Sequence, residues 1–317
     1  MIIQLKTLNK VQKKIKKAVI IAGYQCNNKC QFCTSSAKRD ILAKSTRQIM
    51  AEMISLRKKA FTYLEIIGGE ATIRPDIIEL IGFARHLKFK QIVMATNGRI
   101  FSYKDFSRKI VEAGLSHLIF SIHGHNSRLH DSLTCSPGSF EQLMAGVKNI
   151  RDLGLEISTN TTIVKQNYRH LSQIGKFLLE IGSKNAEFIF VDPTHGAVKE
   201  NFLHFVPKIS VAAPYIKKCL DLGKNKNIHW HVRYVPLCYF SDYVDQISEL
   251  KESVTFHTEH LAPDFVNNNV TDARRTIART KTEKCEGCAL YDICEGIWNV
   301  YLEHYGDKEL NPIQKTS

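Results

Sequence analysis

Short apolar runs alternate with amphipathic stretches along the first 205 residues, and this alternation restricts the fold more than any other feature of the sequence. The apolar runs of strand type are residues 18–23, 63–69, 91–98, 117–124, 155–164 and 186–193. Helical spacing of apolar residues occurs at 45–60, 74–87, 138–154 and 167–182. Such alternation produces a parallel sheet whose strands are connected by helices. Six units are too few for a closed eight-fold barrel, so we predict an open, partial (βα)6 TIM-like barrel over residues 18–205.

The alternation stops after residue 205. We predict an isolated strand at residues 229–240 and a polar irregular connection at 251–280, followed by a cysteine-rich segment. Residues 206–317 are therefore expected to form a small C-terminal domain. Residues 1–17 are expected to form a basic flank, because five of their lysines lie between Lys10 and Lys17.

Composition limits the classes of binding partner and the cellular compartment that we expect for this protein. No apolar run of the 317 residues approaches the ~20 needed to span a bilayer, and the first apolar run is too short for a secretion signal, so we expect a soluble cytoplasmic protein without a membrane partner. Lys and Arg number 44 against 31 Asp and Glu, which favours an acidic partner such as RNA or a carboxylate-rich substrate. No aromatic residues interleave with the lysines at 10–17, so that flank is expected to be solvated.

Three cysteines lie close together directly after the first predicted strand. Cys26, Cys30 and Cys33 have the spacing C-x3-C-x2-C. The cytosol keeps thiols reduced, so clustered cysteines indicate metal ligands or catalytic groups. A structural zinc site normally takes four ligands, and no second cysteine pair lies near in sequence. Three thiolates suit a [4Fe–4S] cluster in which one iron keeps an open position.

This loop resembles the signature of the radical S-adenosylmethionine (radical SAM) superfamily, in which an aromatic residue precedes the last cysteine, as Phe32 does here. The resemblance implies a partial (βα)6 barrel and a catalytic role for the three cysteines. It also implies that the amino and carboxylate groups of SAM bind the open iron. One electron, from a reductant such as flavodoxin or ferredoxin, then cleaves SAM to a 5′-deoxyadenosyl radical that abstracts hydrogen from the substrate.

Further residues match SAM-binding positions of that superfamily. Gly68, Gly69 and Glu70 end the second predicted strand, where the equivalent motif binds the SAM amino group. Glycine permits close backbone approach, and a carboxylate can accept from an ammonium group. Ser121 and Asn160 match positions of polar contacts to the SAM ribose or carboxylate, and Asn97 lies near the same rim. The alternative for each polar residue is a cap or a turn.

Histidines near the fourth strand suggest further chemistry. His123, His125 and His130, with Asp131, fit a proton-handling group, a metal triad or hydrogen-bonded structural residues, and we expect one or two to face the cavity. His229 and His231 are expected on one face of a partly exposed strand.

A second cysteine group lies near the C-terminus. Cys285, Cys288 and Cys294 have the spacing C-x2-C-x5-C, and Cys238 stands 47 residues before them. Four cysteines could hold zinc, although x5 is unusual for a zinc ribbon. The group also resembles the SPASM or twitch domains of radical SAM enzymes, which implies one auxiliary [4Fe–4S] cluster. With Cys238 as fourth ligand the cluster would carry electrons; without it an open iron could hold substrate.

The remaining cysteines and the C-terminal aromatics have a structural interpretation. Cys135 and Cys219 have no neighbouring motif and are expected to be buried apolar residues or a substitute ligand. Trp298, Tyr301 and Tyr305 are expected to pack on one helical face and close the C-terminal domain.

Together these features predict a radical SAM iron–sulfur oxidoreductase. We expect SAM cleavage, hydrogen abstraction inside the barrel, and oxidation or bond formation with an auxiliary cluster taking up an electron. A peptide or protein, a small biosynthetic intermediate and RNA are the substrate classes considered. The rival from a different class is a non-enzymatic zinc- and RNA-binding protein, which would be colourless.

Overall fold

The structure is a computed structural model that describes residues 14–315. Most of the flank predicted at 1–17 therefore lies outside the described residues, but its last three residues belong to the first strand, Ile15–Ile21. Within the described range, no helix combines the length and the apolar character needed to cross a membrane.

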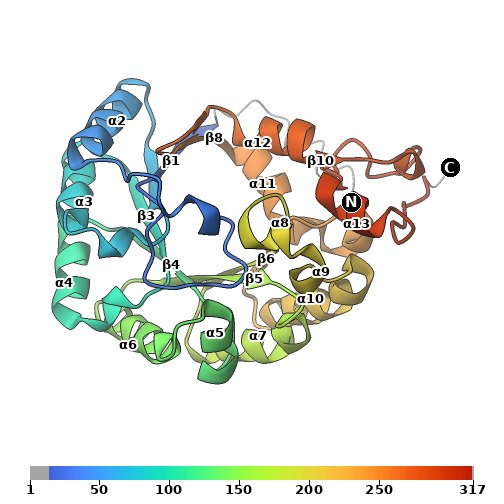
Figure 1. The fold of residues 1–317 in the computed structure, drawn as a ribbon, viewed down its shortest axis with the longest axis horizontal. Coiled ribbons are helices and arrows are strands. Elements are labelled where there is room, and N and C mark those ends of the chain that lie inside the picture. The colour runs from blue at the N-terminus through green and yellow to red at the C-terminus, as the bar shows by residue number, and fades with distance from the viewer. Residues whose placement is uncertain (1–13, 316–317) are drawn as a thin grey trace.

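One curved sheet organises the molecule (Figure 1). Its order is β7-β6-β5-β4-β3-β2-β1-β8-β9; neighbours from β7 to β8 run parallel, and only β9 is antiparallel. The strands are β1 Ile15–Ile21, β2 Tyr63–Ile67, β3 Gln91–Thr96, β4 His117–Ser121, β5 Ile157–Ile163, β6 Asn185–Phe190, β7 His231–Arg233, β8 Phe256–Leu261 and β9 Val266–Asn267. The open, partial barrel is confirmed, since β1 to β6 coincide with the six predicted strands.

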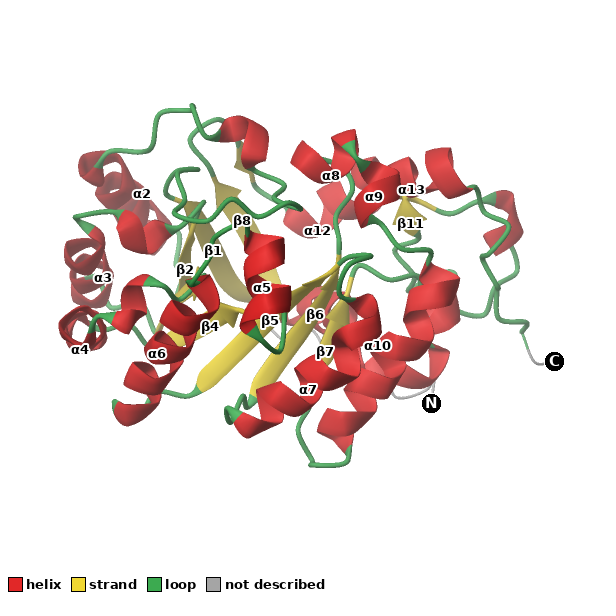
Figure 2. Cartoon of the chain, turned by 60° about the horizontal axis from the view of Figure 1, so that its bottom comes forward, coloured by secondary structure: helices red, strands yellow, loops and turns green. Residues whose placement is uncertain are grey.

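Helices cover the convex side of the sheet, as Figures 1 and 2 show. They are α2 Thr46–Lys58, α3 Ile77–His86, α4 Lys104–Ala113, α6 Ser139–Asp152, α7 Leu171–Glu180 and α10 Ile209–Lys224. The short helix α5, Ser127–Thr134, instead follows the end of β4 and bonds residues 29–31. The start of α2 is fixed by a capping box, because Ser45 Oγ accepts from Gln48 N and the Gln48 side chain accepts from Ser45 N.

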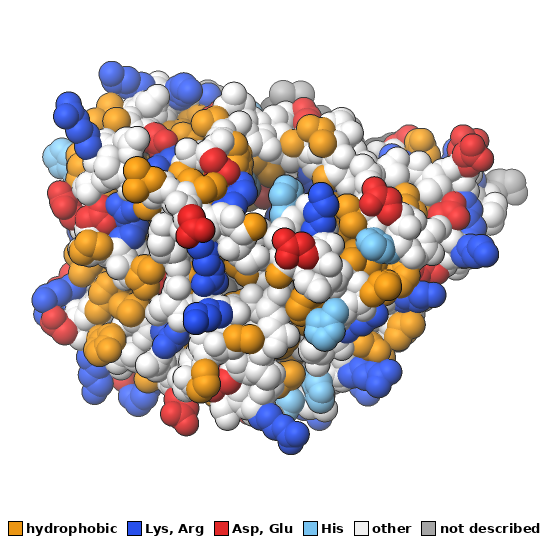
Figure 3. All heavy atoms as spheres, in the orientation of Figure 1, with side chains coloured by type: hydrophobic (Ala, Val, Ile, Leu, Met, Phe, Trp, Pro, Cys, Tyr) orange, Lys and Arg blue, Asp and Glu red, His pale blue; other side chains and the backbone are white. Residues whose placement is uncertain are grey.

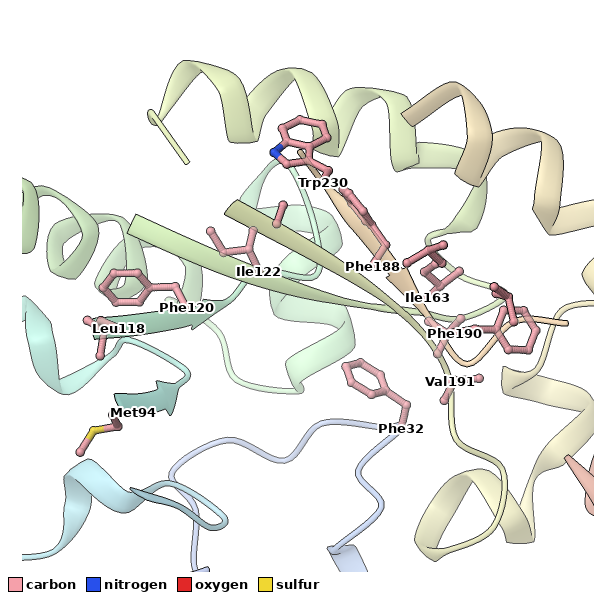
Figure 4. Packing of buried hydrophobic residues seen from close by; sticks show 14 of the residues in the cluster. Phe32, Met94, Leu118, Phe120, Ile122, Ile163, Phe188, Phe190, Val191 and Trp230 are labelled. Carbon is pink, nitrogen blue, oxygen red and sulfur yellow. The ribbon is translucent and has the colours of Figure 1, made fainter. Parts of the chain in front are cut away.

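Alternation along each strand separates the core from the interior of the barrel. On β4 and just beyond it, Leu118, Phe120 and Ile122 are fully buried, and Figure 4 shows them in the apolar core. The intervening residues, Ile119 and Ser121, line the interior cavity instead. The period of two in a strand thus gives the sheet one apolar face for the helices and one functional face.

The sheet continues beyond residue 205, and here the sequence prediction was wrong. The strand predicted at 229–240 is not isolated, since its short core β7 pairs with β6, and the connection predicted at 251–280 contains β8, which pairs with β1. β7 has three residues, too few to show a period, and in β8 only Thr258 is buried. Neither strand carries the apolar signal of a central strand.

The helix α11, Ser248–Thr255, contacts both β7 and β8 and so spans the gap between the two sides of the open barrel. Glu252 of α11 lies 3.2 Å from Arg233 of β7, and Arg233 also pairs with Glu187 of β6 at 2.9 Å. Charged groups therefore join the helix to the sheet at this edge.

The C-terminal segment packs beside the open side of the barrel (Figure 1). It contains α12 Val270–Ala273, a π-helical turn Arg274–Ala278, the antiparallel pair β10 Arg279–Thr280 and β11 Ile297–Trp298, and α13 Asn299–Tyr305. Tyr301 is buried and its ring lies 5.0 Å from that of Tyr305, so the predicted packing of these two residues on the helix is confirmed. The predicted place of Trp298 on the same helical face was wrong, because Trp298 belongs to β11 and its ring lies 5.1 Å from that of Tyr234. Two short helices, α8 Gly196–Glu200 and α9 Phe202–Phe205, connect β6 to α10.

Candidate active site

A cavity of about 570 Å³ occupies the interior of the barrel. All ten residues that the sequence indicated for the first cluster and for SAM line this one cavity. They are Cys26, Cys30, Phe32, Cys33, Gly68, Gly69, Glu70, Asn97, Ser121 and Asn160. Residues from five separate chain segments thus meet in one place, at the carboxyl ends of the strands, where parallel sheets place their ligands.

The three cysteines lie on the loop of residues 24–34, here called the cysteine loop. Its backbone is tied to the end of α5, where Lys29 N donates to Thr134 O at 2.9 Å and Gln31 N donates to Leu133 O at 3.0 Å. Each of the three cysteine residues is partly exposed. The loop therefore presents its thiols to the cavity while its backbone is held from outside.

The charge balance of this loop suits a metal centre. Burial, together with the nearby thiols of Cys26 and Cys33, raises the pKa of the Cys30 thiol to about 12. Burial also raises the pKa of Cys26. Thiolates placed this close together repel one another, and the positive charge of a bound metal offsets that repulsion.

The arrangement is compatible with an iron–sulfur cluster. Across residues 14–315, no three His, Cys, Asp or Glu side chains are disposed to hold one metal ion. An iron–sulfur cluster distributes its cysteine ligands over several metal atoms, so its ligands do not converge on one point. The cysteine loop could therefore hold a [4Fe–4S] cluster with one iron lacking a protein ligand.

Two arginines that the sequence did not single out fix the cysteine loop. Arg99 donates to the carbonyl of Asn27 and, at 2.9 Å, to Asn28 Oδ1. Arg39 donates to the carbonyl of Asn28 at 2.8 Å. The arginines bind carbonyl and amide groups of the loop and hold no ligand themselves. A sequence motif for ligand binding therefore does not include them. The one available signal was the position of Arg99 just after the third strand.

Close contact with the chain around the cysteine loop by itself requires glycine at positions 68 and 69, and a contact of either glycine with SAM stays a prediction. A Cβ at Gly69 would lie 2.2 Å from the carbonyl oxygen of Gln25, and one at Gly68 would lie 2.5 Å from that of Gly23. Gly69 N donates to Gly23 O at 2.9 Å, and Glu70 N donates to Gln25 O at 2.8 Å. The end of β2 thus continues as a bonded support for the loop.

Glu70 is buried and already hydrogen-bonded. Its carboxylate accepts from Thr72 Oγ1 at 2.6 Å, from Thr96 Oγ1 at 2.8 Å and from Asn97 N at 2.7 Å. Burial raises its pKa, and these donors act in the opposite direction. In this arrangement Glu70 orients the Asn97 backbone, and its direct contact with a SAM ammonium group stays a prediction.

The other polar residues indicated by the sequence surround the same space. Asn97 Nδ2 donates to Asn27 Oδ1 at 2.7 Å and lies 3.8 Å from Cys26 Sγ. Ser121 on β4 and Asn160 on β5 are direct register partners. Polar groups therefore line the wall beside the cysteines.

The histidine group separates into different roles. His123 lines the cavity and meets Phe32 edge to face at 4.8 Å. Burial, together with His130, lowers the pKa of His123 to about 3, so its ring is neutral. Asp131 accepts from Gly138 N and Phe140 N at 2.8 Å and caps α6. The metal triad is thus not formed, and one histidine of the group faces the cavity.

Charged side chains line another part of the barrel cavity, and the two carboxylates among them are paired with cations. Glu65 and Glu187 line it, and they pair with Lys17 at 2.7 Å and Arg233 at 2.9 Å. His231 also lines this part, whereas His229 is exposed outside β7.

The four C-terminal cysteines also converge. Cys238, Cys285, Cys288 and Cys294 line one small cavity of about 30 Å³, whose other walls include Leu290, Ile297 and Leu310. Burial, together with the other three thiols, raises the pKa of Cys238 to about 11. Gly296 N donates to Cys294 Sγ at 3.3 Å. This apolar pocket offers four thiols to a bound metal group.

The two remaining cysteines do not join either group. Cys219 is buried between α7 and α10, as predicted, and a Cβ on Gly175 would lie 2.9 Å from its sulfur. The burial predicted for Cys135 was wrong. Cys135 is exposed because it ends α5 in the left-handed conformation, with φ of 48°.

The open parallel barrel, the three cysteines on the loop after β1 and the polar groups at the neighbouring strand ends are the features expected of the radical SAM superfamily. Residues 20–178 match the radical SAM superfamily over half of the chain. The chain therefore belongs to the radical SAM superfamily of iron–sulfur enzymes.

Sequence relatives differ in chemistry. The chain is 28% identical over 174 residues to the AdoMet-dependent heme synthase of Methanosarcina barkeri, covering 53% of this chain and 48% of that protein. It is 23% identical over 233 residues to a probable GTP 3′,8-cyclase of Sulfurisphaera tokodaii, covering 72% of each. The match thus spans about half the length of the heme synthase.

Solved structures share the fold over almost the whole chain. SuiB of Streptococcus suis, bound to precursor peptide SuiA, gives a TM-score of 0.64 at 17% identity, covering 100% of this chain and 78% of SuiB. The enzyme anSMEcpe, with bound AdoMet and the Cp18Cys peptide, gives 0.67 at 14% identity, covering 95% and 92%. The fold similarity therefore includes the segment that follows the barrel.

Proposed function

We propose that this enzyme binds SAM at a [4Fe–4S] cluster held by Cys26, Cys30 and Cys33 and oxidatively modifies a substrate in the barrel cavity. The observation that carries the proposal is the convergence of all ten sequence-indicated residues on one cavity. When bound, the cluster and SAM supply a one-electron cleavage that yields a 5′-deoxyadenosyl radical.

The chain's own residues prepare this site. Arg39 and Arg99 hold the cysteine loop through its backbone and amide groups. Ser121 and Asn160 offer polar contacts for SAM on adjacent strands. Phe32 and the neutral ring of His123 form a wall that carries no charge and offers no acidic proton beside the cysteines. Such a wall limits water around a reactive carbon radical.

We assign an auxiliary [4Fe–4S] cluster to Cys238, Cys285, Cys288 and Cys294. Four thiols around one apolar pocket leave no iron for a substrate, so this group suits electron transfer. Loss of hydrogen from a substrate carbon, followed by loss of one electron and one proton, is a two-electron oxidation. The auxiliary cluster would accept that electron, and flavodoxin or ferredoxin would supply the electron that cleaves SAM.

A peptide or protein is the substrate class that we place first. Two enzymes with bound peptides share the fold of this chain beyond the barrel, including the region of the second cysteine group. A small biosynthetic intermediate is the second candidate, because the relatives include heme synthases and a Fe-coproporphyrin III synthase. RNA has less support, since Lys and Arg are interspersed with Asp and Glu on the face in Figure 3.

The test is to reconstitute the protein anaerobically, reduce it, add SAM and measure 5′-deoxyadenosine. The wild type and the Cys135→Ala control are expected to form it, because Cys135 is exposed and outside both groups. Cys30→Ala is expected to abolish it. Equal product from Cys30→Ala, or no product and no iron–sulfur absorption in the wild type, would refute the proposal.

A further inference from the structure

A second cavity, of about 510 Å³, adjoins the barrel cavity. The two share Thr34, Ser35, Asp192 and Tyr234, so they meet at a junction formed by the cysteine loop, the loop after β6 and the residue after β7. A ligand in the second cavity can therefore reach the space beside the cysteines. We call this second space the outer cavity.

The outer cavity has an apolar rim. Ile277 is 74% exposed and Phe265 is 39% exposed, and both line the cavity together with the buried Trp298. Single exposed apolar residues are common on protein surfaces, but these surround one hollow that leads to a reaction site. The π-helical turn that contains Ile277 is a second indication, because such turns are frequent at functional sites.

The rim is held firmly. Arg274, at the start of the turn, makes two bonds to the Glu295 carboxylate, at 2.6 and 2.8 Å. Asn299 Nδ2 donates to the carbonyl of Ile277 at 2.9 Å. Ile277 therefore keeps its exposed position through bonds made by its neighbours, as a preformed contact for a ligand requires.

The charges of the outer cavity disfavour a polycarboxylate ligand. Lys38 pairs with Asp264 at 2.7 Å, and Arg274 pairs with Glu295. Burial lowers the pKa of His260, so its ring adds no positive charge at neutral pH. The junction itself carries the Asp192 carboxylate. Cations near the cavity are thus already neutralised, whereas apolar surface is available.

Asp192 offers a hydrogen-bond acceptor to the ligand. Its Oδ1 accepts from Thr194 N at 2.9 Å and from Thr194 Oγ1 at 2.5 Å. Between residues 14 and 315, no donor bonds its second oxygen, and the side chain lines both cavities. Tyr234 beside it has a φ of 70°, a costly conformation for a residue with a side chain. Such outliers cluster at ligand sites.

The neighbouring sheet edge suits an extended chain. The strand β9 ends the sheet and, among the described residues, pairs only with β8. Asn267 of β9 lines the outer cavity. An extended peptide can bind such an edge through its backbone, with its side chains in adjacent pockets.

We propose that the outer cavity binds an apolar side chain of an extended peptide substrate on Phe265 and Ile277, while Asp192 accepts an N–H of that peptide at the entrance to the barrel. This inference rests on the proposed function, of which it specifies the substrate class. It makes Ile277 and Phe265 determinants of specificity and Asp192 a substrate-binding residue.

The test measures binding of two fluorescein-labelled heptapeptides of glycine and asparagine to the reconstituted enzyme with SAM. One carries two leucines and the other two serines at the same positions. The leucine peptide is expected to bind at least about tenfold more tightly. Ile277→Glu is expected to remove that preference, and Asp192→Asn to weaken both peptides. The control Leu42→Glu changes a residue that is 87% exposed and lines neither cavity, so it should leave binding unchanged.

Three results would overturn the inference: no binding of either peptide, equal loss in the Ile277 and Leu42 variants, or tighter binding of coproporphyrin III that Ile277→Glu removes. Formation of 5′-deoxyadenosine by the wild type and by Leu42→Glu is measured on the same samples. If it occurs while peptide binding fails, the inference fails and the proposed function stands. If it is absent throughout, the proposed function itself fails.

Discussion

Gly69 and Glu70 form the support on which the cysteine loop rests. Their backbone N–H groups donate to Gly23 O and Gln25 O, and the Gly69 Cα lies against the carbonyls of Tyr24 and Gln25. A side chain at position 69 has no free space, because the obstructing atoms are backbone and cannot rotate away. The glycine requirement therefore follows from the contact between two loops, before any ligand is considered.

Gly69→Ala is expected to destabilise the fold by about 3 kcal/mol and to reduce iron bound at the cysteine loop, since its Cβ would lie 2.2 Å from Gln25 O. The measurements are urea denaturation and iron content after anaerobic reconstitution. The matched control is Gly82→Ala in α3, where an added Cβ meets nothing within 4 Å. There we expect a gain of about 0.5–1 kcal/mol from helix propensity. Equal behaviour of the two variants would contradict the support role.

His130 illustrates a second effect at this scale, the cost of burying a titratable ring. Burial lowers its pKa from near 6.5 to about 4, and its Nδ1 accepts from His123 N at 3.3 Å. The unfolded chain binds the proton more readily than the folded chain. Stability is therefore fully present above about pH 6.5 and declines as pH falls from 6.5 toward 4.

At pH 5.5 this group should have removed roughly 1.4 kcal/mol of stability relative to neutral pH. His130→Gln retains an acceptor but cannot titrate. Between pH 7.5 and pH 5.5, the stability of this variant should therefore fall by roughly 1.4 kcal/mol less than the stability of the wild type. Urea denaturation at the two pH values measures the difference. The exposed His86→Gln serves as the control, and a pH dependence unchanged by His130→Gln would reject this assignment.

Residue-level prediction from the sequence located the barrel cavity where motifs were available and failed where tertiary contacts decide. Cysteine spacing indicated three of the ten residues around the barrel cavity, and the resemblance to the radical SAM superfamily, together with the strand ends, indicated the other seven. Arg39 and Arg99 were missed, because a basic residue that binds loop carbonyls has no spacing rule. Cys135 was misplaced because burial was inferred from residue type, whereas a helix end set its conformation.

At the scale of elements, the helix α11 spans the gap between the two sides of the open barrel, where a closed barrel would have further strands. It touches β7 at one end of the sheet and β8, the last parallel strand, near the other end, and it carries Glu252 between Arg233 and Arg274 at 3.2 and 3.8 Å. The first six strands were predictable because buried parallel strands are continuous apolar runs. β7, β8 and α11 were not predictable, since short polar elements at a sheet edge gain stability from neighbours that the local sequence does not specify.

Glu252→Gln is expected to destabilise the protein by about 2 kcal/mol, because two partly or fully buried arginines lose a carboxylate partner. Thermal or urea denaturation measures the loss. The control is Glu112→Gln, whose partner Arg108 lies on the exposed face of α4, with side chains 60% and 49% exposed. That change should cost well under about 1 kcal/mol. If Glu252→Gln lowered the stability no more than Glu112→Gln, the result would argue against the role of α11 in joining the two sides of the open barrel.

At the scale of the whole molecule, the chain builds two thiol-rich centres of different design. The cysteine loop gathers three cysteines over eight positions and opens on the large barrel cavity. The second centre takes Cys238 from just beyond β7 and three cysteines from the C-terminal segment, around a small apolar pocket. Buried arginines and carboxylates, including Arg279 and Glu249 at 3.4 Å, link that segment to the barrel edge. This arrangement favours an open centre that binds the reactants and a closed centre that transfers electrons.

This division predicts separable iron contents. The reconstituted wild type should hold about eight irons, four in each [4Fe–4S] cluster. Cys238→Ser removes one of four ligands from the closed centre, so iron should fall toward about four per chain, while one turnover of SAM to 5′-deoxyadenosine continues from the cysteine loop. Cys30→Ser should lose a similar amount of iron but abolish SAM cleavage, and Cys135→Ser should change neither quantity. If Cys238→Ser retained all its iron, Cys238 would not be a ligand; if it lost SAM cleavage as Cys30→Ser does, the two centres would not be independent.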